Sequence, residues 1–477
     1  MVPMLIIMPL VGAGVAWLVP DNRWRPWLLP VTGLIHIFLT IDLVSYPPQA
    51  SLGGWIRLDS LGSLVLLAIS PLFLACAFYS VGYLAYRQER SNRTLCMGLL
   101  VCLGAMSLTA VARHLGLLWL ALETTTLVMA PLIYFNRNAR SLEATWKYML
   151  ICSVGIALAL LGILFMAYST MVAGQEATLL IDPLVAAARH LSPAWLHASF
   201  VFILVGFGTK IGLAPLHTWK PDAYGESPGL VGAMLSGGLV ICAFLGLIRV
   251  YQVCLAAGDT SFYRDALIVM GLISTAFAAI FLVRQNDFKR MLAYSSVEHV
   301  GIVVIGLGLG RGALFATLLH LLLNGFAKGI LFLAAGNIHR SYNSKRCDMV
   351  HGVLRRLPWS GGLFLAGFFA VTASPPFAMF ISEFGIVSGA FADGHTVVPV
   401  LLLLCLAVAF MGMAANVLPM AFGERLRDSE RTPYRDSLLT VGPPLMLAAL
   451  LLVFGLWLPA PLVRIIRDAG MILEGMS

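Results

Sequence analysis

Charged side chains are scarce in this chain of 477 residues. Asp, Glu, Lys and Arg together make up 11% of it, whereas hydrophobic residues make up 59%, and the mean hydropathy is +0.89. Soluble domains carry about 25% charged residues. The composition therefore excludes a soluble globular protein.

Motifs for energy conversion are missing as well. No P-loop pattern of the type G-x-x-x-x-G-K-[ST] occurs, so the chain lacks that kind of nucleotide-driven motor. Its 8 cysteines include no C-x-x-C pair. They argue for neither disulfides nor iron–sulfur clusters, because several lie in apolar runs where packing explains them. We expect no cofactor and no metal in this chain.

Long hydrophobic runs are abundant instead. Runs of 18 or more mostly apolar residues recur along the whole chain, and each can cross about 30 Å of hydrocarbon. The first run has no basic residue before it and Arg23 and Arg25 after it, so we expect a retained helix and not a cleaved signal. The pattern predicts an all-α polytopic membrane protein with 14 spans, at residues 2–19, 27–46, 58–84, 95–112, 115–135, 146–172, 197–220, 227–252, 264–284, 292–309, 312–337, 360–391, 397–422 and 437–461.

The net charge of +8 is distributed by loop. Of the 31 Lys and Arg residues, 21 belong to the loops between an odd-numbered span and the next even-numbered one, when Lys147, Lys220 and Arg284 at the span ends are counted with the loops they adjoin. The positive-inside rule places those loops in the cytoplasm. Both termini are then expected outside, and the alternation argues against nucleic-acid binding. The two richest loops, 340–356 and 425–435, fit topology anchors, with docking of a partner as the alternative.

Lys210 lies inside an apolar run and opens the segment KIGLAPLHTWKPDA at residues 210–223. A lysine at membrane depth costs about 2.5–3.5 kcal/mol on insertion scales, so an ion pathway with a named partner is its default explanation. Pro215 breaks the helix beside it. A broken helix at that depth occurs where it is packed in protein or lines a wet cavity, as at transporter sites. The segment therefore predicts ion movement.

No linker divides the chain, so we predict a single membrane domain, residues 1–477, with an internal duplication. The twelfth span is interrupted at Pro375 and Pro376, near Glu383, and stands five spans after the interrupted seventh. Paired broken helices suggest inverted repeats, which place ion sites near the bilayer midplane. The expected parts are three N-terminal helices in 1–94, two five-helix repeats in 95–252 and 264–422, and a last helix in 437–461.

Other polar side chains are spread along the predicted spans. Glu123 has no basic residue within a helical turn and needs a partner from another helix. We expect that partner to be Lys210, unless Glu123 is a surface carboxylate at a misplaced span end. His320, Asn324 and Lys328 recur every fourth residue, which puts them on one helix face that can line a wet track.

His299 and Glu298 are adjacent at the start of the tenth span, so they point about 100° apart and only one faces that track. We favour His299, with helix-end capping or subunit packing as the alternative for Glu298. Glu383 has no local cation and is expected to be functional. His217, Asp222 and Glu298 are candidates for proton uptake or an accessory role, with helix capping as the alternative for Asp222.

These segments resemble the antiporter-like subunits of respiratory complex I, a family shared with Mrp-type antiporters and membrane-bound hydrogenases. The resemblance covers nearly the whole chain, and its marks are the pattern at 210–223, DFKRMLAYSS at 287–296 and SEF at 382–384. It implies a fourteen-helix proton-translocating subunit. It also implies a glutamate on the fifth helix, a lysine on the broken seventh and a charged residue on the twelfth, which Glu123, Lys210 and Glu383 match.

Within the family, WKYMLICS at 146–153 and the pair Glu298-His299 look most like the hydrogenase-4 and formate hydrogenlyase branch. The sequence departs from the family in two ways. Many relatives carry a lysine in the eighth helix, whereas residues 234–248 hold no ionisable side chain apart from Cys242, so the middle of the relay is unassigned. The sequence continues for few residues after the fourteenth span, so we do not expect it to clamp its neighbours through the long lateral helix of the largest complex I antiporter-like subunit.

The expected mechanism is a proton relay along the membrane midplane with one carboxylate as its switch. An ion pair at about 4 Å and an effective dielectric near 20 is worth about 4 kcal/mol. Moving one charge across 150 to 200 mV costs about 3.5–4.6 kcal/mol, so one such switch can drive about one proton. The switch is Glu123 and the relay is Lys210, His299 or His320, Lys328 and Glu383.

The driving energy must come from partner subunits. By resemblance these are other membrane subunits and a cytoplasmic, hydrogenase-like oxidoreductase arm, which holds iron–sulfur clusters and, in a hydrogenase, a nickel–iron centre. The expected location is the bacterial cytoplasmic membrane, with protons and bilayer lipid as further partners. His299 and His320 are the sole plausible haem pair, and we expect no b-type haem.

Two other functions stay open. A subunit of an Mrp-type sodium–proton antiporter, or of an ion-coupled inorganic-carbon uptake complex, would share the helices and differ in its partners. Sequence separates these poorly, because a sodium site built from backbone oxygens leaves no motif. A structural anchor with a vestigial relay is the third possibility, since the eighth-helix lysine is missing.

Overall fold

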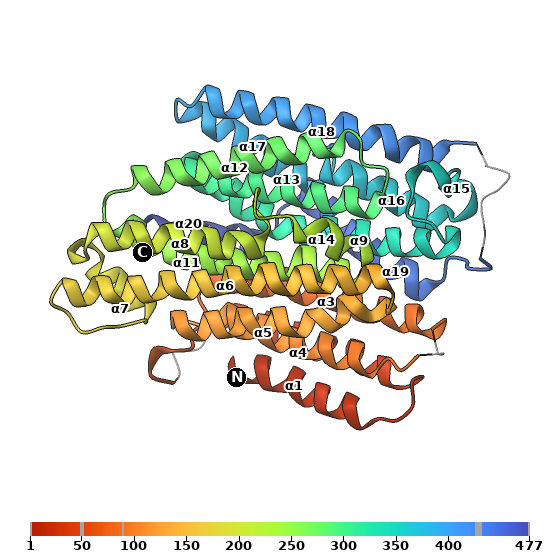
Figure 1. Ribbon diagram of the computed structural model, residues 1–477, viewed down its shortest axis with the longest axis horizontal. Helices are drawn as coiled ribbons and strands as arrows, with labels where there is room; N and C mark the ends of the chain where they lie inside the picture. Colours follow the sequence, from red (N-terminus) through yellow and green to blue (C-terminus); the bar gives the residue numbers. More distant parts are fainter. Residues whose placement is uncertain (1, 48–51, 88–89, 425–431, 476–477) are drawn as a thin grey trace.

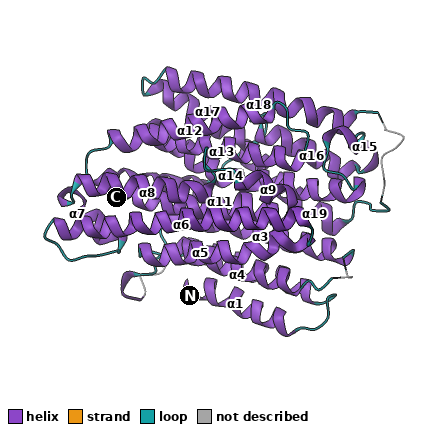
Figure 2. Ribbon diagram, viewed as in Figure 1, coloured by secondary structure: helices purple, strands orange, loops and turns teal. Residues whose placement is uncertain are grey.

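The computed structural model describes residues 2–47, 52–87, 90–424 and 432–475. These residues form a bundle of long helices that run side by side, and they contain isolated β-bridges but no strand (Figure 2). The α-helices are α1 (Val2–Leu18), α2 (Leu28–Ser45), α3 (Ser60–Ala85), α4 (Arg93–Val111), α5 (Leu115–Ile133), α6 (Ala139–Val172), α7 (Ile181–Ala187), α8 (Pro193–Ile211), α9 (Trp219–Glu226), α10 (Gly229–Ala233), α11 (Val240–Ala256), α12 (Ser261–Leu282), α13 (Phe288–Leu309), α14 (Arg311–Tyr342), α15 (Val353–Arg356), α16 (Pro358–Val371), α17 (Ala378–Ala392), α18 (Val397–Phe422), α19 (Leu438–Leu456) and α20 (Ala460–Glu474).

Every predicted span has a counterpart in the bundle. Within the described residues, 12 helices are long and apolar enough to cross a membrane, and α1, α16 and α17 are shorter apolar helices. The seventh span is α8 followed by α9, and the twelfth is α16 followed by α17. The all-α polytopic fold with these two broken helices is therefore confirmed.

Helix ends extend past the apolar runs that predicted them. The sixth span was expected from residue 146, but α6 begins at Ala139 because a capping box precedes it. The backbone N–H of Ser141 donates to Asn138 Oδ1 at 2.7 Å, and the N–H of Asn138 donates to Ser141 Oγ at 3.0 Å. Such reciprocal bonds satisfy the free N–H groups of a helix start. Hydropathy measures only the part of each helix that lies in lipid.

The chain after the last span forms α20, which the sequence analysis did not anticipate. Its buried side chains are Leu462, Ile466, Ala469 and Leu473, at the spacing of one helix face. This face packs against α3, α11 and α14 (Figure 1). The segment therefore lies along its own bundle.

α14 lies at the centre of the bundle. In the most apolar stretch of each helix, 100% of the residues of α14 and 94% of those of α13 are buried, whereas only 28% of those of α18 are. Outer helices thus present apolar side chains to lipid, while α13 and α14 are enclosed by protein. His299, His320 and Lys328 all lie on these two enclosed helices.

The C-terminal ends of α1 and α18 lie at the same end of the bundle as α15 (Figure 1). This is the end at which the predicted cytoplasmic loops emerge, so the arrangement fits the charge pattern. In the basic loop 425–435, residues 425–431 lie outside the described residues. The orientation of the chain in the membrane stays a prediction.

Both interrupted helices break where proline was expected to break them. α8 ends at Ile211, Gly212 follows in the left-handed region with φ +82°, and α9 begins at Trp219. α16 ends at Val371 and α17 begins at Ala378. A third irregularity, the π-helix η5 (Met234–Leu239), interrupts the eighth span between α10 and α11. Such π-helical turns are frequent at functional sites.

Candidate functional site

Lys210 lies in the last turn of α8 and is buried against α5. Its Nζ donates a hydrogen bond to the backbone carbonyl of Leu122 at 2.8 Å and another to the Thr126 hydroxyl. The α8 break thus brings a lysine amine against two oxygen acceptors inside an apolar bundle. Both acceptors belong to the helix that carries Glu123.

The expected ion pair between Glu123 and Lys210 is not formed in this structure. Among the described residues Lys210 forms no ion pair, and its Nζ bonds only a carbonyl and a hydroxyl. Glu123 Oε2 is buried and has no hydrogen-bond partner. Lys210 instead contacts the residue before Glu123 and the residue one turn after it. The two groups are close enough to interact electrostatically. The structure therefore holds this pair open.

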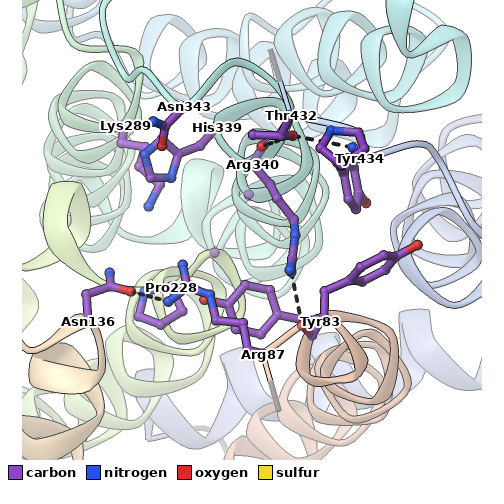
Figure 3. Close-up of a pocket in the computed structure, with 14 residues that line it drawn as sticks. Tyr83, Arg87, Asn136, Pro228, Lys289, His339, Arg340, Asn343, Thr432 and Tyr434 are labelled. Atoms are coloured by element: carbon purple, nitrogen blue, oxygen red, sulfur yellow. Dashed lines mark hydrogen bonds between the residues drawn. The ribbon is translucent and has the colours of Figure 1, made fainter. Parts of the chain in front are cut away.

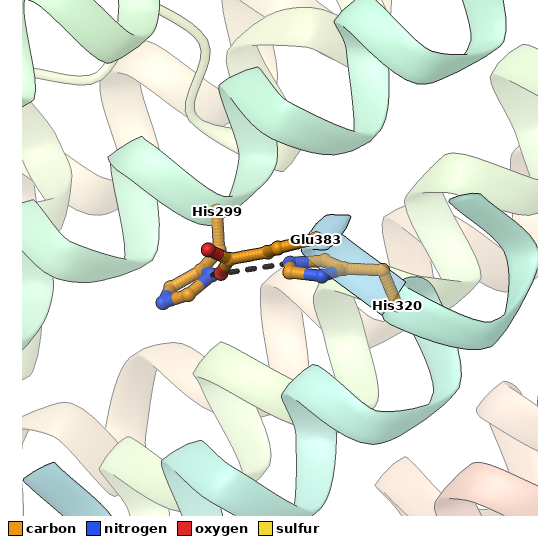
Figure 4. Close-up of side chains that lie close together, drawn as sticks. All are labelled: His299, His320 and Glu383. Atoms are coloured by element: carbon orange, nitrogen blue, oxygen red, sulfur yellow. Dashed lines mark hydrogen bonds and ion pairs between the residues drawn. The ribbon is translucent and has the colours of Figure 1, made fainter. Parts of the chain in front are cut away.

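Three titratable side chains from three helices meet in the second half of the bundle (Figure 4). His299 of α13 and His320 of α14 share a hydrogen bond between Nδ1 and Nε2 at 3.1 Å. Glu383 of α17 brings its Oε1 to 3.7 Å from His299 Nδ1. The hydroxyl of Ser382 lies 3.0 Å from His320 Nδ1. This chain of contacts can pass a proton between the rings because each imidazole has one donor and one acceptor nitrogen.

Lys328 lies two turns along α14 from His320 and is fully buried. Its Nζ donates to Ser295 Oγ at 2.7 Å, and the nearby carboxylates that act on its charge are Glu298 and Glu383. The side chain of Asn324, between His320 and Lys328 in sequence, is buried with Oδ1 unpartnered. The three residues predicted to share a face are thus all enclosed.

The structure separates the accessory candidates. Glu298 is buried near Lys328, whereas Asp222 is bound by surface cations. Lys147 Nζ lies 2.8 Å from Asp222 Oδ2, and Arg290 contacts its other oxygen. His217 lies in the break between α8 and α9, and its Nδ1 has no partner. Asp222 therefore joins α6, α9 and α13 at the surface and is not part of the buried series.

Sequence reasoning missed Lys220. It was counted as the one basic residue of the loop after the seventh span, yet its side chain is 0% exposed. Its Nζ lies 3.3 Å from Ser296 Oγ of α13 and 5.8 Å from the centre of the Tyr224 ring. A signal was available, because Lys220 falls inside the same marked segment as Lys210.

Arg249 was also missed, at the end of the predicted eighth span. Its guanidinium is fully buried and bonds both carboxylate oxygens of Asp59 at 2.6 Å. Arg113 adds a contact to Asp59 at 2.7 Å. Burial alone would raise the pKa of the Asp59 carboxyl. The guanidinium groups of Arg249 and Arg113 lower the pKa by more than burial raises it, so the net pKa is about 2. This cluster caps α3 and joins it to α11, away from the relay candidates.

A basic cavity of about 480 Å³ opens at the end of the bundle where α14 ends (Figure 3). Arg87, Lys289 and Arg340 line it together with several tyrosines, and no carboxylate is among its lining residues. Arg340 lies over the rings of Tyr86 and Tyr434, 4.6 and 5.5 Å from their centres. These stacked contacts hold the guanidinium in place.

The cluster of His299, His320 and Glu383 has the spacing of a small metal site, since its donor atoms lie within 4.8 Å of one another. The charge of Lys328 acts on both histidines and opposes a second cation beside them. The direct contact of the two rings at 3.1 Å leaves no room for haem iron between them. The cluster is better suited to exchanging protons than to holding a metal.

The fold and site define a class: a polytopic transport subunit built around two interrupted helices, each carrying a buried ionisable side chain. The model for the transmembrane part of NADH:quinone oxidoreductases and Mrp antiporters matches residues 112–411. The chain therefore belongs to this NADH:quinone oxidoreductase and Mrp antiporter family.

Curated relatives cover nearly the whole chain. It is 31% identical to the "Hydrogenase-4 component F homolog" of Methylacidiphilum infernorum over 98% of this chain and 99% of that protein. It is 30% identical to "F(420)H(2) dehydrogenase subunit N" of Methanosarcina mazei over 88% and 85%.

Two solved structures share the fold. A chain of the archaeal membrane-bound sulfane sulfur reductase superposes with a TM-score of 0.88 at 22% identity, covering 99% of this chain and 97% of that one. A chain of the Mrp complex from Dietzia sp. DQ12-45-1b gives 0.88 at 19%, covering 100% and 97%.

Proposed function

We propose that this protein is the proton-translocating membrane subunit of a redox-driven complex of the hydrogenase-4 type. The observation that carries the proposal is a set of buried ionisable side chains inside an otherwise apolar bundle. A buried charge at membrane depth is expensive and is retained where ions move. The buried set comprises Lys210, Glu298, His299, His320, Lys328 and Glu383, and beside it lies Glu123, which is partly buried and whose Oε2 is inaccessible.

Lys210 is the group whose proton the switch controls. With the pair open, its amine is held by the Leu122 carbonyl and the Thr126 hydroxyl. Turning the amine toward the unpartnered Glu123 Oε2 would close the pair and hold the proton on Lys210. An ion pair at about 4 Å with an effective dielectric near 20 contributes about 4 kcal/mol. That matches the work of moving one charge across about 150 to 200 mV, about 3.5–4.6 kcal/mol.

In the second half of the bundle, the proton passes from Lys328 to the pair of histidines and Glu383. Glu298 and Glu383 both interact electrostatically with the Lys328 ammonium. When either carboxylate binds a proton and loses its charge, Lys328 therefore binds its own proton less tightly. The imidazole contact at 3.1 Å supplies the donor and acceptor that the transfer needs. Glu383 on the second broken helix is the exit group.

Inverted repeats account for the correspondence of the two halves. We assign the first repeat to residues 95–252 and the second to 264–422. α6 packs against the broken helix α8, and α14 packs against the broken helix α17. Each half thus presents one interrupted helix to one continuous helix, the arrangement expected of repeats around a midplane site.

The reaction that supplies the energy takes place in partner subunits, because the chain has neither a P-loop nor a cluster-binding pattern. The relatives' names are those of hydrogenase-4 and of F420H2 dehydrogenase subunits. We therefore assign a cytoplasmic oxidoreductase arm with iron–sulfur clusters and a nickel–iron centre, in a bacterial cytoplasmic membrane with both termini of this chain outside. Protons are the transported ion, and sodium is the alternative.

Purification of the native complex through a tag on this subunit tests the proposal. Partner polypeptides are identified, nickel and iron are measured, and hydrogen, formate and NADH are offered in turn as electron donors. Inverted vesicles then report proton uptake by quenching of an acridine dye. Nickel, iron and donor-dependent quenching are expected. A metal-free assembly that exchanges sodium for protons would replace the proposal with the antiporter function, and a carbonic-anhydrase-like partner with the carbon-uptake function.

A further inference from the structure

The relay described above has a gap between Lys210 on α8 and Lys328 on α14. The eighth span, which lies between them, offers no titratable side chain over residues 234–248 apart from Cys242. Lys220 is a fully buried amine that the proposed function leaves unused. We propose that Lys220 is the middle proton carrier, which receives a proton from Lys210 and passes it to Lys328. This inference rests on the proposed function.

At the α8 break the chain turns back, and this brings the Lys220 side chain close to the backbone beside Lys210. A Cβ built on Gly212 would lie 2.5 Å from Lys220 Cδ and Cε and 2.9 Å from its Nζ. The Lys220 side chain therefore fills the space beside the backbone only two residues after Lys210. The Cys152 thiol interacts electrostatically with both amines, which places it near each of them.

On its other side, Lys220 meets α13 at the point where Lys328 also meets it. Lys220 Nζ lies 3.3 Å from Ser296 Oγ, and Lys328 Nζ lies 2.7 Å from Ser295 Oγ. Neighbouring hydroxyls of one helix turn thus hold amines from the two halves of the protein. A serine hydroxyl both donates and accepts, so it can orient a transfer between amines.

Charge favours a carrier at this position over a fixed structural cation. Among the described residues, no carboxylate lies within 4.0 Å of Lys220 Nζ. A buried ammonium without a counter-ion is unfavourable, and the charge of Lys328 acts directly on Lys220. The two amines repel when both are protonated. A proton that arrives on one therefore drives the release of a proton from the other.

The transfer is balanced at each step. The Lys210 ammonium loses a proton to the neutral amine of Lys220, which becomes an ammonium. Lys220 then returns to the neutral amine as its proton passes to the neutral amine of Lys328. Lys210 regains a proton from the uptake side, and Lys328 passes its proton on to the histidine pair and Glu383, so each lysine ends the cycle as it began. Nothing is oxidised or reduced in this chain.

The test is a substitution of Lys220→Gln in the intact complex. Glutamine is one atom shorter than lysine and keeps an N–H donor for Ser296, but it cannot carry a proton. Inverted vesicles are supplied with whichever of hydrogen, formate and NADH the complex oxidises, and dye quenching is divided by the rate of electron transfer. The quench per electron is expected to fall at least tenfold, with the complex assembled on a native gel.

Two variants serve as controls. Lys289→Gln alters another buried lysine, which donates to the Ser227 carbonyl at 2.7 Å and lies outside the relay. It is expected to retain the wild-type quench per electron. Lys210→Ala is expected to abolish the quench. Should Lys210→Ala pump normally, the proposed function itself fails.

A Lys220→Gln complex that assembles and pumps normally, while Lys210→Ala does not, would overturn the middle-carrier role alone. If Lys220→Gln prevents assembly, Ser296→Ala decides the question because it keeps the lysine and removes its hydroxyl partner. A several-fold lower quench per electron supports the role of Lys220. Unchanged pumping by Ser296→Ala counts against it.

Discussion

Thr126→Val tests the switch by changing one atom that Lys210 contacts. Valine has the shape of threonine without the hydroxyl, so the substitution removes one acceptor from the open arrangement and leaves Glu123 in place. A hydrogen bond to a charged group contributes about 1.5–3 kcal/mol. The two bonds of Lys210, to Thr126 and Leu122, therefore hold the open arrangement by about 3–6 kcal/mol. The closed ion pair contributes about 4 kcal/mol.

The free energies that stabilise the open and the closed arrangements are therefore similar, so a small change in either can shift the equilibrium between them. Loss of about 1.5–3 kcal/mol from the open side shifts the equilibrium about 10- to 150-fold toward the closed Glu123–Lys210 pair, since each 1.4 kcal/mol is a factor of ten. The proton is then held on Lys210. If the two arrangements are equally populated in the wild type, the open fraction falls from one half to between about 1/11 and 1/151, so proton uptake per electron should fall about 5- to 75-fold.

The assay is dye quenching in inverted vesicles divided by the rate of electron transfer, with assembly checked on a native gel. Thr124→Val is the matched control, because this hydroxyl of the same helix donates only to the Leu120 carbonyl. The control should pump as wild type does. Wild-type pumping by Thr126→Val would refute the idea that Lys210 is held by the hydroxyl in its open state.

Three further outcomes follow from the packing. Arg249→Leu removes both hydrogen bonds that Arg249 makes to the Asp59 carboxylate and leaves Arg113 as its remaining cation. It should destabilise the protein by about 3 kcal/mol and lower the unfolding temperature in detergent; an unchanged temperature would show that the pair adds no stability. His320→Phe removes the imidazole that contacts His299, so the complex should keep electron transfer and lose proton uptake. Persistent dye quenching in this variant would contradict the role of His320. Gly212→Ala adds a Cβ 2.5 Å from the Lys220 chain in a left-handed residue, so it should reduce assembly, measured on a native gel, whereas Gly362→Ala, with open space around it, should not.

Much of the fold was predictable because burial in lipid leaves a simple signal. Spans needed only hydropathy and length, and the two broken helices needed only Pro215 and the Pro375-Pro376 pair within them. α20 escaped this reasoning because its polar face lowers its mean hydropathy, although its apolar face packs on the bundle. The start of α6 depended on the capping residue Asn138, which hydropathy does not measure.

The site was predictable one helix at a time. Lys210 and Glu383 were singled out because each is a lone charge in an apolar run. The contact of His299 with His320 depends on how α13 and α14 are rotated relative to each other, and this rotation cannot be predicted from the sequence of either helix. Lys220 was counted with a loop and Arg249 was not singled out, because each lies near a span end, where a surface cation has the same sequence appearance as a buried one.

The open state of Lys210 lay beyond sequence reasoning for another reason. The residues predict that Glu123 and Lys210 attract, but the competing acceptors are a backbone carbonyl and the Thr126 hydroxyl. A carbonyl is present in every residue, so no pattern marks it. Only the position of the α8 break against α5 reveals which acceptor is within reach.

Proton uptake by the purified complex in sealed liposomes, compared between the wild type and Lys210→Ala, tests the central claim most directly. Both complexes should transfer electrons from the same donor and contain the same subunits. We expect the wild type to acidify the lumen during electron transfer and Lys210→Ala to leave the lumen pH unchanged. Equal acidification by both would contradict a relay that begins at Lys210.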